Sequence, residues 1–148
     1  APIRTATAQC FSFIADVSGD VSGTGVADQI TYNFDSSKNT LRRRQDNWSG
    51  PPKYEFAGGS FQPLAGSVDL LTFTYYDANN QVLPMEDWTS THACPPDPKA
   101  KLEKRKQLTY EQMRQIRRVA ITLKTLGSRP GIYPDSFTLT SDVHLRNL

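Results

Sequence analysis

The sequence predicts a single α+β domain, covering residues 1–148, in which antiparallel β-sheet dominates. Apolar residues recur at every second position in several segments, which is the period of half-buried strands. Turn-forming Gly, Pro, Asn and Asp residues separate these segments, and only one short stretch carries the signals of a helix. A chain of 148 residues is long enough to bury a core without a second domain.

Six segments are expected to form strands. In "CFSFIAD", Phe11 and Phe13 share one face, and in "ITYNF" the residues Ile30, Tyr32 and Phe34 do the same. The clearest alternation lies in "SVDLLTFTYYD", followed by an "ANN" turn that predicts a hairpin with "QVLPM". "VAITLKTL" and "FTLTSDVHL" predict a last antiparallel hairpin. The predicted strands are 10–16, 29–34, 39–44, 67–76, 117–126 and 136–146.

The one predicted helix lies near 110–116. Thr109 is in position to cap it, and Gln112, three residues later, completes a capping-box pattern. The stretch 86–106 is dominated by Pro, polar and charged residues, and we expect it to be a long loop tethered by Cys94.

Cys10 and Cys94 either form a disulfide or remain as two buried free thiols, since no CxxC spacing indicates a zinc or redox site. We favour the disulfide, which would indicate an oxidising compartment.

Positive charge is concentrated in two segments. Residues 99–118 contain eight Lys or Arg and two Glu, and a predicted hairpin at 29–44 ends in "LRRR". A solvated loop explains this pattern, and so does contact with an acidic partner. Nucleic acid is a less favoured partner, because only Tyr110 supplies an aromatic side chain in the basic segment. We expect an acidic face of a neighbouring subunit to contact Arg42, Arg43, Arg44, Lys104, Arg105 and Lys106.

A partial calcium-loop pattern precedes the second predicted strand. Asp16, Ser18, Asp20 and Asp28 could supply oxygen ligands to Ca²⁺, but the glycine that an EF-hand loop needs at position 6 is replaced by Val21. A turn whose aspartates accept backbone N–H groups explains the same residues. No other cofactor is expected.

No catalytic motif is found, and we predict that the protein is not an enzyme. His92 and His144 are isolated, and nucleophile-elbow, zinc-protease and nucleotide-binding motifs are absent.

The ordered succession "DQITYNFDSSKNTLRRR", "PLAGSVDLLTFTYYDANNQVL", "QIRRVAITLKTL" and "FTLTSDVHLRNL" resembles the globular head of prepilin-type proteins. The resemblance is in particular to the PilW-like minor pilins and the J-type minor pseudopilins, and it covers about residues 10–148. The resemblance implies a pilin-like head and a non-catalytic subunit of a type IV pilus or a type II secretion pseudopilus. It also implies other pilin or pseudopilin subunits as partners and a bacterial surface filament, extracellular or periplasmic, as the location.

The family's apolar N-terminal helix is absent from this sequence. We expect it to have been removed or to come from another chain, and membrane contact only through that helix. An alternative function is a free secreted β-rich module that binds calcium or carbohydrate, with Trp48, Tyr54 and Trp88 as aromatic surfaces for the ligand.

Overall fold

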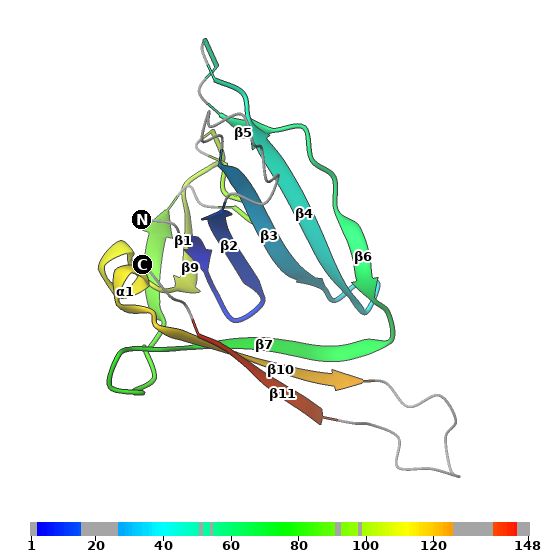
Figure 1. The fold of residues 1–148 in the computed structure, drawn as a ribbon, viewed down its shortest axis with the longest axis vertical. Coiled ribbons are helices and arrows are strands. Elements are labelled where there is room, and N and C mark those ends of the chain that lie inside the picture. Colours follow the sequence, from blue (N-terminus) through cyan, green and yellow to red (C-terminus); the bar gives the residue numbers. More distant parts are fainter. Residues whose placement is uncertain are drawn as a thin grey trace.

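The computed structural model describes residues 3–15, 27–50, 52–53, 55–90, 93–97, 99–125 and 138–144. Within these ranges the chain forms two larger antiparallel sheets, one hairpin and one short helix (Figure 1). The elements, in chain order, are β1 (Ile3–Ala6), β2 (Cys10–Ala15), β3 (Asp28–Asp35), β4 (Thr40–Trp48), β5 (Phe56–Ala57), β6 (Gln62–Ala65), β7 (Val68–Tyr76), β8 (Glu86–Ser90), β9 (Glu103–Gln107), α1 (Tyr110–Gln115), β10 (Arg118–Thr125) and β11 (Thr138–His144).

Sheet A has the order β1-β2-β3-β4, and both β5 and β6 pair with β4. Its strands follow the alternation in the sequence, because Ile30 and Phe34 lie on one face of β3 while Thr31 lies on the other. Sheet B has the order β11-β10-β7, and β8 pairs with β9 as a separate hairpin.

Sheet B runs across the ends of the sheet A strands (Figure 1). Two backbone hydrogen bonds fix this crossing. The N–H of Phe73 donates to the Ala8 carbonyl at 2.8 Å, and the N–H of Val68 donates to the Asn39 carbonyl at 2.9 Å. Strand β7 therefore contacts the β1–β2 turn and the β3–β4 turn, and the two sheets form a corner.

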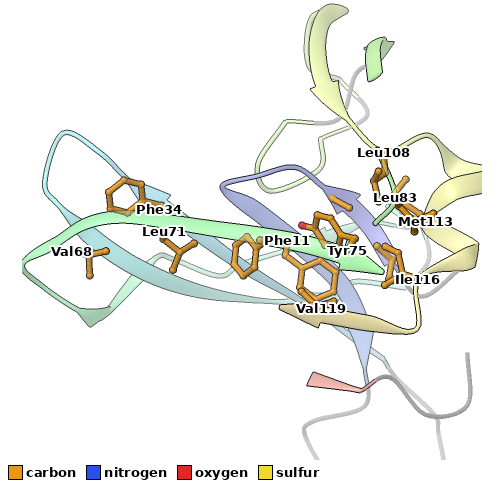
Figure 2. Close-up of a cluster of buried hydrophobic side chains, with 13 residues drawn as sticks. Phe11, Phe34, Val68, Leu71, Tyr75, Leu83, Leu108, Met113, Ile116 and Val119 are labelled. Atoms are coloured by element: carbon orange, nitrogen blue, oxygen red, sulfur yellow. The ribbon is translucent and has the colours of Figure 1, made fainter. Parts of the chain in front are cut away.

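The core follows β7 along its length (Figure 2). Near one end of β7, Val68 and Leu71 lie near Phe34, while near the other end Tyr75 lies close to Ile116, just after α1. Tyr75, Leu71 and Ile116 are completely buried. The apolar face that the sequence predicts for 67–76 is thus the central contact surface of the fold.

The predicted α+β class, with a pilin-like head, is wrong, because the described part of the chain is all-β. Strands make up 59% of it, and α1 has only six residues. The capping box predicted at Thr109 and Gln112 is present, but the chain becomes extended at Ile116 and enters β10. A correct helix signal therefore produces fewer than two turns of helix.

The six predicted strands are confirmed within the described residues, with β4 reaching Trp48. The predicted hairpin after β7 is reduced to a single bridge between Tyr76 and Val82, and the antiparallel partner of β7 is β10. The predicted loop 86–106 instead contains β8 and the first residues of β9, two of the five short strands that alternation did not reveal.

Candidate functional site

An apolar groove lies in the corner between the two sheets. Its volume is about 390 Å³. Sheet A lines it with Ile3, Phe11, Phe13, Ile14, Tyr32 and Leu41, and sheet B lines it with Leu71, Phe73, Val119, Ile121 and Val143. The two sheets touch where the rings of Phe11 and Phe73 lie 6.0 Å apart between centroids, and the groove opens beside this contact.

Several groove residues are not fully buried. Phe13, Tyr32, Leu41 and Ile121 are half-buried, and Val143 on the edge strand β11 is 46% exposed. This incompletely covered apolar surface is the candidate contact site of the domain.

A second pocket, of about 630 Å³, lies on the opposite face of sheet A. We call it the polar pocket. It is lined by Arg4, Gln29, Arg44, Asp46, Trp48, Glu55, Phe56, Ala57 and the loop residues 93–97. Buried polar side chains form this face of the sheet, as in the 3.0 Å hydrogen bond between the hydroxyls of Ser12 and Thr31.

The predicted disulfide between Cys10 and Cys94 is confirmed, with Cα atoms 6.2 Å apart. Cys10 begins β2, and Cys94 belongs to the loop that forms one wall of the polar pocket. The bond therefore holds a distant segment of the chain against sheet A.

The arginines of the predicted basic surface on β4 are held by neighbouring side chains. Arg42 forms a 3.0 Å ion pair with Asp35, and its guanidinium lies 4.4 Å from the centre of the Phe61 ring. The hydrogen bond from the Ser37 hydroxyl is the main cause that lowers the pKa of the Asp35 carboxyl below its ordinary value. Burial opposes this effect, and the Arg42 charge adds to the lowering. Arg43 donates to the side-chain oxygen of Gln45.

Lys104, Arg105 and Lys106 lie on β9, where Arg105 forms a 2.7 Å ion pair with Glu103. The residue that follows β9, Leu108, donates its N–H to the Ala6 carbonyl of β1. Because β1 and β4 are separated by β2 and β3, the structure places the two predicted basic groups at opposite sides of sheet A (Figure 1).

Of the predicted calcium ligands, Asp16, Ser18 and Asp20 lie outside the described residues. Asp28 is buried and accepts a hydrogen bond from the Gln45 amide at 3.1 Å. In the described part of the chain, no group of three or more His, Cys, Asp or Glu side chains is arranged to hold a metal ion.

The aromatic residues of the predicted carbohydrate surface are separated. Trp48 packs against Phe56 in the polar pocket, with ring centroids 5.0 Å apart, while Trp88 meets Tyr110 edge-on at 4.8 Å. Tyr54 and His92 lie outside the described residues, and His144 is exposed on β11.

The sequence did not reveal Arg4 as a site residue. Strand β1 is four residues long and contains no alternation that would have indicated a strand.

No helix in the described ranges is long and apolar enough to cross a membrane. No model of a known protein family matches the sequence, and a search of curated proteins also finds no match.

Proposed function

We propose that the protein is a non-catalytic subunit of a bacterial surface filament, either a type IV pilus or a type II secretion pseudopilus. The apolar groove between sheets A and B carries this proposal. In a filament subunit of the prepilin type, this groove would receive an apolar helix that connects the domain to the filament core. The helix would precede the domain in the same chain or belong to another subunit.

The length of strand β10, which borders the groove, suits a helix that packs across it. Strand β10 has eight residues, which correspond to about 27 Å, the length of a helix of about 18 residues. One helix face would cover Phe13, Ile121 and Val143, which are incompletely buried in this domain.

The disulfide agrees with the location that this function requires. Disulfides persist in the bacterial periplasm and outside the cell, where filament subunits fold and assemble. The proposal requires neither a metal site nor a catalytic group.

A matched pair of substitutions tests the proposal. Val143 lines the groove and is 46% exposed, whereas Leu70 on β7 is 45% exposed and lies on the outer face of sheet B. Val143→Asp introduces a charge where the helix would pack, so we expect the variant to fold but to be lost from surface filaments sheared from producing cells. Leu70→Asp makes the same kind of change outside the groove, and we expect it to assemble.

Circular dichroism and an assay for free thiols establish that both variants are folded. Equal recovery of Val143→Asp and Leu70→Asp in the filament fraction would contradict the proposal. So would the failure to find any filament that contains the wild-type protein.

A further inference from the structure

Among the residues that the structure describes, Arg4 supplies a cation to the polar pocket without an acidic partner. The side chain lines the pocket, and its Nε atom is buried without a hydrogen-bond partner. No ion pair joins Arg4 to any carboxylate in the described part of the chain. A guanidinium without a paired carboxylate favours an anionic ligand, since it can offer its terminal N–H groups to a carboxylate in a fixed, planar geometry.

The other charged groups of the pocket already have partners. Asp46 is 1% exposed, and it accepts hydrogen bonds from Arg44 at 2.8 Å and from the Gly59 N–H at 2.9 Å. Glu55 lies 3.7 Å from the ammonium group of Lys99. The carboxylate of Asp97 accepts the backbone N–H of Lys99 at 2.9 Å.

The backbone of β1 directs Arg4 toward its position. Ile3 pairs with Phe13 and Thr5 pairs with Ser12, so Arg4 is an additional residue in β1 opposite two consecutive residues of β2. Such bulges change the direction of a side chain and are common next to binding sites. Here the bulge leaves Ile3 in the apolar groove and Arg4 in the polar pocket on the other face.

An aromatic wall lies in the same pocket. Trp48, with 37% of its surface exposed, packs on Phe56, and both rings line the cavity. The volume of about 630 Å³ lies within the range of roughly 300–1,000 Å³ that is typical of small-molecule sites. The pocket thus combines an apolar aromatic surface with polar and charged groups from sheet A.

We propose that the polar pocket binds an acidic sugar residue of an extracellular glycan, with Arg4 holding the carboxylate and Trp48 packing against the C–H face of the ring. A pyranose carboxylate presents an apolar face, hydroxyl groups and one negative charge, and each has a counterpart in the pocket. Gln29, which lines the same pocket, carries a side-chain amide that can hydrogen-bond to a sugar hydroxyl group. This site is separate from the groove, so it does not depend on the proposed filament function.

Titration of the protein with glucuronate, followed by amide chemical shifts, tests the proposal. We expect shifts at Gln29, Trp48 and Ala57, with a dissociation constant on the order of a millimolar, as is reasonable for one sugar ring with few contacts. Glucose, which lacks the carboxylate, is expected to bind at least tenfold more weakly. Added salt should weaken glucuronate binding, because the contact with Arg4 is ionic.

Two site variants and one control separate the contributions. Arg4→Gln should weaken glucuronate binding about tenfold or more, so that its affinity comes close to that of glucose. Trp48→Ala should weaken the binding of both sugars. Arg114→Gln removes the same charge from an exposed position on α1 and should leave the titration unchanged.

The absence of shifts around the pocket at high glucuronate concentration would overturn the proposal. Equal binding by the wild-type protein and Arg4→Gln would also overturn it. The same holds if a short peptide with a free C-terminal carboxylate binds the pocket more tightly than glucuronate does, because the ligand would then be a peptide.

Discussion

Replacing Tyr75 with Phe tests whether one buried hydroxyl holds the turn between β1 and β2 against sheet B. The Tyr75 side chain is completely buried, and its hydroxyl donates to the Thr7 carbonyl at 2.8 Å, with a longer contact of 3.4 Å to the Cys10 carbonyl. Phe keeps the ring and its contact with Phe11, where the ring centroids are 5.7 Å apart. Only the hydroxyl and its hydrogen bonds are lost, so we expect the free energy of unfolding to fall by about 1–3 kcal/mol.

The same substitution should change how stability depends on pH. Burial raises the pKa of Tyr75 well above its ordinary value of 10.0. Above about pH 10 the unfolded chain loses this proton while the folded chain keeps it, so the contribution of Tyr75 to stability declines as the pH rises toward the folded pKa. At about pH 11 this loss amounts to about 1.4 kcal/mol in the wild-type protein and is absent in Tyr75→Phe.

Urea unfolding at about pH 8 and about pH 11, followed by tryptophan fluorescence, measures both effects. The difference in the free energy of unfolding between the wild-type protein and Tyr75→Phe should be present at the lower pH and smaller by about 1.4 kcal/mol at the higher pH. Tyr76→Phe is the control, since Tyr76 is only half-buried and lies under the guanidinium of Arg118 at 3.7 Å. Equal effects of the two substitutions at about pH 8 would refute this account of the Tyr75 hydroxyl.

Two further predictions concern the polar side of sheet A. The double substitution Cys10→Ala and Cys94→Ala removes a disulfide that joins residues separated by 84 positions in the sequence. It should lower the free energy of unfolding, measured by urea unfolding, by about 4.5 kcal/mol. A loss below about 1 kcal/mol would show that the chain-entropy argument fails for this disulfide. Gly59→Ala should cost about 1–3 kcal/mol, because a Cβ atom there would overlap the Gln45 carbonyl. The control Gly66→Ala has open space around its Cβ position, and a similar melting temperature for the two variants would contradict the steric argument.

The sequence predicted those elements whose signals are local. The turn after Asp35, the alternation of β7 and the capping box at Thr109 each depend on neighbouring residues, and each is present in the structure. Strands β8 and β9 were missed because most of their residues are polar or charged, and Trp88 is the main apolar side chain among them. Without apolar residues at alternate positions, neither segment carries the signal that identified the other strands.

The candidate sites were less predictable than the strands. Alternation identified the apolar faces that carry Phe13 and Ile121, but it could not show that the two sheets meet at a corner and leave these faces incompletely covered. Arg4 becomes a pocket residue only through a bulge in β1 and through a loop that the disulfide brings from Cys94. Neither condition can be read from the residues around Arg4.

The disulfide also determines how the domain would respond to mechanical tension along its chain. When the two ends of the chain are pulled apart, the force is transmitted from Cys10 through the disulfide to Cys94. The segment between these two residues therefore carries no load while the bond is intact. With a sequence separation of 84, that segment represents about 280–300 Å of extended chain that a stretching force cannot release. Sheet A from β2 to β6, together with β7, lies within this covalent loop, so the apolar groove and the polar pocket keep most of their walls even when force pulls the terminal strands away.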